Sequence, residues 1–168
     1  GTPRNRMEDL ADDIAAVIRA LGLAQVDLLG FSIGGLQVQE VALRHPALVR
    51  KLLLLGTGLR GGDPTMDPKV LDVAPTPVPT AEDFLFLFFG RSDAAKQAGL
   101  AFWERRHQRV DQDPPSSAAV AQAQAEAYAA YLVPLPGKNP YAYLSAITQP
   151  TLVLNGDCTD EGLLEDEN

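Results

Sequence analysis

The chain has 168 residues and a mass of 18.0 kDa, a usual size for one globular domain. Apolar residues make up 46% and charged residues 21%, which is typical of a folded chain rather than a disordered one. The net charge of −8 repels the phosphate backbones of nucleic acids, so a nucleic-acid partner is not expected. A single cysteine excludes an internal disulfide framework and a multi-cysteine zinc site.

The sequence shows no feature of a membrane or exported protein. Its longest apolar run, Phe84 to Phe89, is far too short to span a bilayer, and no basic segment followed by an apolar stretch opens the chain. With the lone Cys158, these features predict a cytoplasmic protein and leave its oligomeric state open. Because the first residue is Gly rather than Met, we expect the chain to be a piece of something longer.

The first third of the chain carries a helix and then a strand–helix–strand pattern. Apolar residues recur at helical spacing from Met7 to Leu21, and Asn5 with Glu8 three residues later predicts a capping box. The next elements are expected as a strand at 26–30, a helix at 33–45 and a strand at 52–55. Because both strands are short and apolar, we predict a parallel βαβ unit with a buried sheet.

After residue 57 the composition changes into a loop rich in Gly and Pro. Beyond it we expect helices at 80–89, 92–109, 117–132 and 141–147, and a third apolar strand at 150–156. This order predicts an α/β core made of residues 1–60 and 146–168, interrupted by a helical insertion at 61–145. The tail from 157 to 168 carries six acidic residues and no basic one, and we expect it to fray.

The most specific signal is Gly30-Phe31-Ser32-Ile33-Gly34, which lies where the first strand meets the second helix. This G-x-S-x-G pattern is typical of a nucleophile elbow, a strained turn that holds a serine hydroxyl above the carboxyl ends of the strands. In such a turn Gly30 and Gly34 must lack side chains because they press against each other. The backbone N–H of Ile33 lies at the helix N-terminus, where it can stabilise an oxyanion. The alternative is a serine that only caps the helix, with glycines present for packing.

With these residues the sequence resembles the α/β-hydrolase family, over a stretch from residue 5 to about residue 155. Three further segments are similar to family segments: Arg44-His45-Pro46, Gly56-Thr57-Gly58 and Ile147 to Gly156. The likeness is to the serine esterases and the cofactor-free haloperoxidase-like enzymes. It implies a partial α/β-hydrolase parallel sheet with a helical cap insertion, no cofactor and no metal. Ser32 would attack carboxylic esters or similar small acyl substrates and form an acyl-enzyme.

The resemblance also implies which residues contact the substrate and assist the serine. A cap over the site makes Phe31, Phe84 and Phe88 candidates for an apolar acyl pocket; the alternative for the cap phenylalanines is packing onto the sheet. Family members carry their acid three residues past the glycine that follows the third strand, where this chain has a threonine. Asp160 is the preferred acid and Asp157 its rival, the alternative being that both belong to a solvated acidic tail.

The catalytic base is the main departure from the family pattern. The family's histidine lies after the acid, and no histidine follows His107 in this chain. His45 ends the second helix and His107 lies among arginines on an insertion helix, so we expect neither to act as base. Without a base, Ser32 keeps an ordinary hydroxyl and is a poor nucleophile near neutral pH. The competing hypothesis is a non-catalytic fragment or degenerate homologue that acts at most as a binding module.

Two further interpretations concern the sheet and a glycine pattern. The strand at 26–30 suits the centre of a sheet, yet the visible chain supplies one neighbour, at 52–55, so we expect an open apolar edge and marginal stability. Gly56 to Gly61 matches the dinucleotide pattern G-x-G-x-x-G, but the glycines and prolines that follow prevent the helix that this fingerprint requires. A nucleotide-binding domain is therefore set aside.

Overall fold

The computed structural model describes residues 3–62, 68–73, 76, 79–108, 110–111, 114, 116–137, 139 and 141–156. These residues divide into two compact units, the first within 1–64 and 117–156 and the second within 65–116. Each unit is described by itself.

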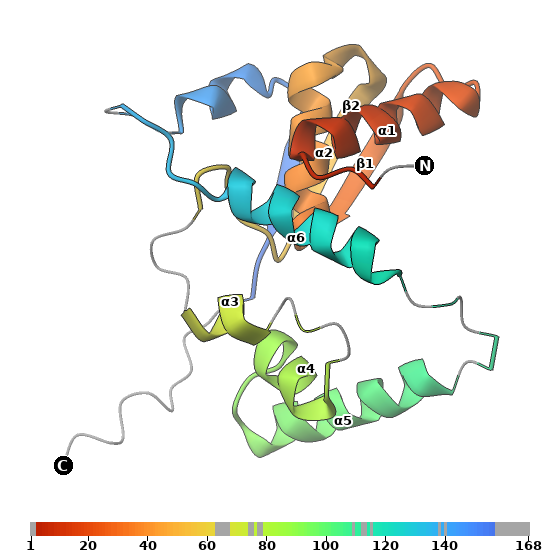
Figure 1. Cartoon of the computed structure of the whole chain (residues 1–168), viewed down its shortest axis with the longest axis vertical. Coiled ribbons are helices and arrows are strands. Elements are labelled where there is room, and N and C mark those ends of the chain that lie inside the picture. The colour runs from red at the N-terminus through yellow and green to blue at the C-terminus, as the bar shows by residue number, and fades with distance from the viewer. Residues whose placement is uncertain are drawn as a thin grey trace. The chain divides into compact units, whose positions relative to one another are not determined.

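The first unit is built on a three-stranded parallel sheet (Figure 1). Its strands are β1 (Val26–Phe31), β2 (Val49–Leu55) and β3 (Thr151–Leu154), in the order β1-β2-β3. The three predicted strands and their parallel pairing are therefore confirmed. Within the described part of the chain, β1 pairs with β2 alone and forms the predicted open edge.

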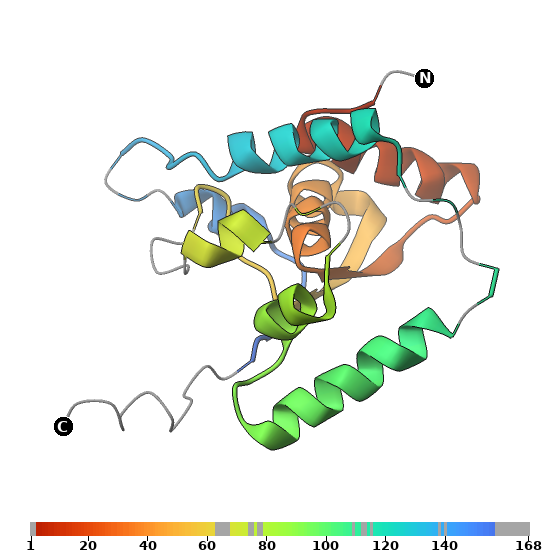
Figure 2. The same cartoon turned by 60° about the horizontal axis from the view of Figure 1, so that its bottom comes forward.

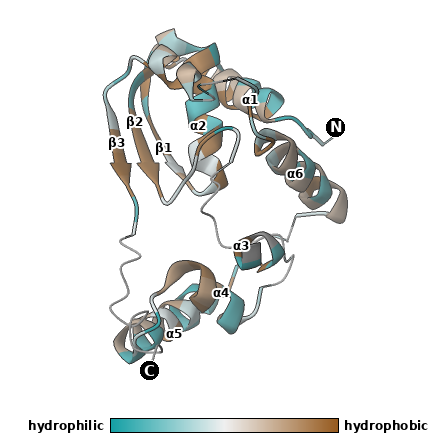
Figure 3. Ribbon diagram, turned by 90° about the vertical axis from the view of Figure 1, so that its left-hand side faces the viewer, coloured by the Kyte–Doolittle hydropathy of each residue, from teal (hydrophilic) through white to brown (hydrophobic). Residues whose placement is uncertain are grey.

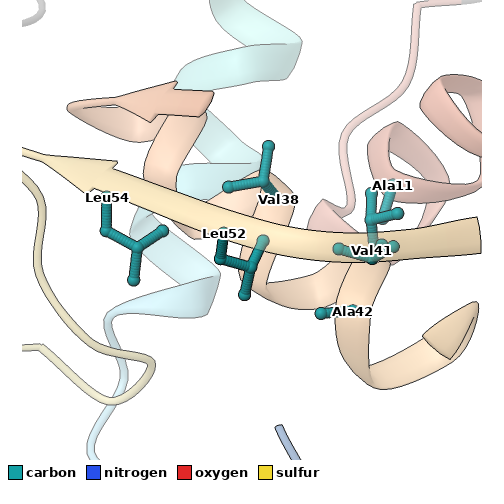
Figure 4. Close-up of a cluster of buried hydrophobic side chains, with 7 residues drawn as sticks. Ala11, Val38, Val41, Ala42, Leu52 and Leu54 are labelled. Carbon is teal, nitrogen blue, oxygen red and sulfur yellow. The ribbon is translucent and has the colours of Figure 1, made fainter. Parts of the chain in front are cut away.

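One face of this sheet is covered by a helix, α2 (Ile33–Arg44), and a second helix, α1 (Met7–Ala20), packs against α2 (Figure 3). The short helix η1 (Pro46–Leu48) leads into β2. Side chains of α2 and β2 meet in the main core (Figure 4), which consists of Ala11, Val38, Val41, Ala42, Val49, Leu52 and Leu54. The predicted capping box of α1 is wrong. Arg6 is the N-cap and makes no side-chain cap bond, and Asn5 instead donates to Glu126 at 3.3 Å.

The opposite face of the sheet is apolar and exposed. In the observed register Leu29 lies opposite Leu53, which lies opposite Leu152, so these three side chains form a row on that face. Leu29 and Leu152 are 60% and 51% exposed, and β2 and β3 carry hydrophobic colour toward their arrowheads in Figure 3. The described residues thus cover one face of the sheet with helices and leave the other to solvent.

Helix α6 (Ala118–Tyr131) belongs to the first unit and runs beside α1 (Figure 2). Ala123, Ala127 and Tyr131 recur every four residues and are buried, and the Tyr131 hydroxyl donates to the buried Glu40 carboxylate at 2.9 Å. The short helix η2 (Ala142–Ala146) also lies in this unit. The predicted insertion at 61–145 therefore does not coincide with the second unit, because its last part packs with the core.

The second unit consists of α3 (Pro68–Val73), α4 (Ala81–Phe88) and α5 (Asp93–His107). Thr80 and Asp83 form a capping box at the start of α4, and the Ser92 side chain caps α5. The two longer helices confirm the predicted segments, whereas α3 was not predicted. Across the described residues, no helix combines the length and apolar character needed to cross a membrane.

A carboxylate on α1 holds the end of α2. The Asp12 carboxylate accepts bonds from Arg44 Nε at 3.1 Å and Nη2 at 2.7 Å, and His45 Nε2 lies 2.7 Å away. The bonds from Arg44 and His45 lower the pKa of Asp12 from 3.8 to about 2. Arg19 Nη2 lies 3.3 Å from the other ring nitrogen of His45. His45 is thus a helix-terminal histidine, as predicted.

The Asp12 cluster makes stability depend on acid pH. Because the pKa of Asp12 is lowered in the folded state, its stabilising effect is present above pH 3.8 and is lost as the pH falls toward about 2. We predict that Asp12→Asn lowers the free energy of unfolding above pH 3.8 and flattens its decline below that value. Arg44→Met should flatten the same decline, since Arg44 is the largest cause of the shift. Urea unfolding across this pH range tests both variants, and an unchanged decline in Asp12→Asn contradicts the assignment.

Candidate active site

Ser32 is the single residue between β1 and α2. Its φ of 52° and ψ of −124° place it in the left-handed half of conformational space, and it is the one non-glycine residue with positive φ in the described part of the chain. Such a backbone costs about 1–3 kcal/mol and persists where surrounding contacts enforce it. Ser32 stands at the N-cap position, but its side chain makes no capping bond. The helix-cap alternative therefore does not explain this serine.

Backbone contacts hold Ser32 from both sides. Its N–H donates to the Leu55 carbonyl at 3.0 Å, at the end of β2. Its carbonyl accepts the Gly35 N–H at 2.9 Å and the Thr57 hydroxyl at 2.7 Å. Ser32 itself is exposed. The turn is thus a fixed corner that presents Ser32 to solvent at the carboxyl end of the sheet.

Two glycines are required around this corner. A Cβ at Gly30 would lie 2.4 Å from the Gly34 carbonyl oxygen and 2.6 Å from the Gly35 Cα. A Cβ at Gly35 would lie 2.4 Å from the Thr57 hydroxyl oxygen, whereas a Cβ at Gly34 meets no described atom within 4 Å. The predicted requirement for glycine holds at Gly30 and is wrong at Gly34, because the tight contact falls on Gly35, the next residue along the helix.

The start of α2 supplies an anion-stabilising group. The N–H groups in the first turn of a helix lack acceptors within the helix and carry the positive end of its dipole. Ile33 is the first residue of α2 and directly follows Ser32. The role predicted for its N–H, stabilising an oxyanion next to the serine, is compatible with this position.

The described residues of the first unit place neither a predicted acid nor a histidine beside Ser32. Asp157 and Asp160 lie outside the described residues. His45 lies at the far end of α2, whose 12 residues span about 18 Å, and its two ring nitrogens contact Asp12 and Arg19. His107 belongs to the second unit, where its Nδ1 lies 2.7 Å from the Trp103 carbonyl oxygen.

The phenylalanines predicted for the acyl pocket lie in both units. Phe31 ends β1 in the first unit and is 53% exposed. In the second unit, Phe84 is 8% exposed and stacks on Phe102 with ring centroids 5.6 Å apart. Phe88 is 45% exposed. Phe84 therefore packs between α4 and α5, and contact of any of these rings with a substrate stays a prediction.

The first unit has a hollow of about 580 Å³ that the sequence did not predict. It is lined by Gln39, Leu52, Leu54, Thr57, Gly58, Leu59, Gly62, Tyr141, Leu144, Ile147, Thr151, Val153 and Asn155. Among the described residues that form its wall, Ser32 is not included, and Thr57 is the one that also touches the Ser32 corner. Several of these residues lie in the two family-like segments 56–58 and 147–156, but the hollow itself was not predicted, because it forms between segments far apart in the chain.

Other kinds of site find little support in the described part of the chain. Residues 56–62 form no helix, so the G-x-G-x-x-G run does not open the helix that a dinucleotide site needs. Within the described ranges, no group of three or more His, Cys, Asp or Glu side chains is placed to hold a metal ion.

Comparisons with known proteins agree on one family. The family model described as "alpha/beta hydrolase fold" matches residues 1–163. An alpha/beta hydrolase fold protein from Chitinophaga pinensis is 24% identical, with a TM-score of 0.71 over 92% of this chain and 66% of that protein. The N-acyl homoserine lactonase AidH, complexed with N-butanoyl homoserine, is 19% identical, with a TM-score of 0.55 over 93% of this chain and 54% of that protein. These two likenesses concern the fold.

Curated relatives match shorter stretches at higher identity. The serine O-succinyltransferase of Xanthomonas campestris pv. campestris is 47% identical over 49 residues, or 29% of this chain and 13% of that protein. RutD of Pantoea ananatis, whose name assigns it to carbamate hydrolysis, is 40% identical over 50 residues, or 30% of this chain and 18% of that protein. Each of these matches spans less than two thirds of the relative's own length.

The glycine contacts predict opposite effects for two neighbouring substitutions. Gly30→Ala should destabilise the chain by about 3 kcal/mol or more, because its methyl group overlaps backbone atoms that cannot move aside. Gly34→Ala is the matched control: its methyl group meets open space, and alanine favours a helix over glycine by up to about 1 kcal/mol. Urea unfolding measures both. Equal destabilisation by the two variants contradicts the packing seen at the corner.

Proposed function

The chain belongs to the α/β-hydrolase fold family, and on this premise we propose that it is the part of a serine hydrolase that carries the nucleophile, Ser32. The substrates proposed are carboxylic esters or similar small acyl compounds. The observation that supports the proposal is the positive φ of Ser32 at the junction of β1 and α2. A strained serine at the carboxyl end of a parallel strand is the feature that a nucleophile elbow requires.

The proposed reaction passes through an acyl-enzyme. Ser32 Oγ bonds to the acyl carbon and loses its proton to a base, which then protonates the departing alcohol. No described residue of the first unit is placed beside Ser32 as this base, since both ring nitrogens of His45 contact Asp12 and Arg19. Negative charge on the acyl oxygen is stabilised by the Ile33 N–H at the start of α2. Water attacks the acyl-enzyme and releases the acid, returning the proton to Ser32. Asp160, or its rival Asp157, is proposed to orient the base. Phe31, Phe84 and Phe88 stay proposed contacts of the acyl chain, and 61–145 stays a proposed cap insertion.

An acyl-enzyme can also pass its acyl group to a hydroxyl other than water. The name of the Xanthomonas campestris relative assigns it that outcome, with serine as acceptor. Hydrolysis is the outcome we propose for this chain. We also propose that the protein acts in the cytoplasm.

The alternative function is binding without catalysis. It is favoured by the contacts of His45, which engage both ring nitrogens with Asp12 and Arg19 rather than with Ser32. In that case the acyl site binds its ligand and the serine stays unreactive.

A fluorophosphonate probe distinguishes the two functions. We predict that the chain is labelled, that mass spectrometry places the adduct on Ser32, and that Ser32→Ala abolishes labelling because the attacking oxygen is gone. Ser145→Ala is the matched control, since this serine lies in η2 and its hydroxyl donates to the Ala142 carbonyl. A folded chain that remains unlabelled would support the binding module and reject the hydrolase.

A further inference from the structure

We propose that Thr57 is a positioning residue for the nucleophile: its hydroxyl fixes the peptide group between Ser32 and Ile33. This inference rests on the proposed function, because it concerns how Ser32 and the Ile33 N–H are held for acyl transfer. Thr57 lies in the loop after β2, and β2 pairs with β1, the strand that ends just before Ser32. Its Oγ1 donates to the Ser32 carbonyl at 2.7 Å, the usual length of an O–H···O hydrogen bond.

The bond from Thr57 sets a direction as well as a position. A trans peptide group is planar, and its C=O and N–H point to opposite sides. The Ser32 carbonyl is held by the Thr57 hydroxyl and the Gly35 N–H, so the N–H of Ile33 in the same peptide group must point away from both. That N–H is the proposed oxyanion donor, and it stabilises the oxyanion only while it points toward it. If the peptide group could rotate freely, its N–H would not keep pointing at the oxyanion.

The loop that carries Thr57 is itself tied down. The buried Gln39 side chain donates to the Gly35 carbonyl and to the Gly58 carbonyl, each at 3.1 Å, and so joins α2 to the residue after Thr57. The Thr57 side chain also fills the space above Gly35, where any Cβ would collide with it. Thr57 is therefore a rigid support, and its hydroxyl cannot turn away without disturbing these contacts.

Two substitutions separate the hydroxyl from the shape of the side chain. Thr57→Val keeps the branched shape and removes the donor, whereas Thr57→Ser keeps the donor and removes one methyl group. We expect the rate of fluorophosphonate labelling at Ser32 to fall about tenfold in Thr57→Val and to recover within about twofold in Thr57→Ser. Thermal unfolding of each variant shows whether a slower labelling rate comes from loss of the fold instead of loss of the hydroxyl. An unchanged rate in Thr57→Val, or an equal loss in Thr57→Ser, overturns the proposal.

Amide hydrogen exchange supplies a readout that needs no reaction. The Ser32 N–H donates to the Leu55 carbonyl, and the Gly35 N–H donates to the Ser32 carbonyl. If the corner loosens, both amides become exposed to solvent. We expect both to exchange about tenfold faster in Thr57→Val and at the original rate in Thr57→Ser. If the unaltered chain is not labelled at all, the hydrolase proposal fails and exchange alone decides the role of Thr57. Unchanged exchange in Thr57→Val then overturns it.

Discussion

The structure depends on one backbone constraint, the left-handed conformation forced on Ser32 where β1 turns directly into α2. A serine avoids that conformation unless other contacts outweigh its cost. Here the N–H is held by the end of β2 and the carbonyl by the loop after β2, so the neighbouring strand enforces the corner. Gly30 and Gly35 provide the room in which the corner can form.

The same constraint explains why the candidate site lies where it does. Ligand sites in parallel sheets gather at the carboxyl ends of the strands, where successive loops emerge side by side. In this chain Ser32 follows β1, Thr57 follows β2, and the N–H of Gly56 donates to the Leu154 carbonyl at the end of β3 at 2.9 Å. The predicted acids, Asp157 and Asp160, follow β3 in the sequence. Hydrogen bonds therefore link the end of β1 to the end of β2, and the end of β2 to the end of β3. This arrangement supports a site assembled from the loops that follow the strands.

Much of this architecture was predictable from sequence because local patterns determine it. The apolar strands and the G-x-S-x-G turn appear as predicted. The start of α1 was not predictable, because Asn5 bonds to Glu126, a residue 121 positions away. The place of α6 depended on small buried alanines that look the same in any helix, and the requirement at Gly35 depended on Thr57 from the loop after β2. Long-range contacts of this kind leave no mark in the local pattern.

The conformation of Ser32 in solution is the most direct test of the account. In a nuclear Overhauser experiment, a positive φ brings the amide proton of a residue closer to its own Hα than any negative φ does. We expect Ser32 to show this strong intraresidue cross-peak, matching the glycines with positive φ such as Gly22 and unlike Ser117 at the start of α6. A weak cross-peak at Ser32, equal to that of Ser117, would contradict the corner on which the proposed nucleophile depends.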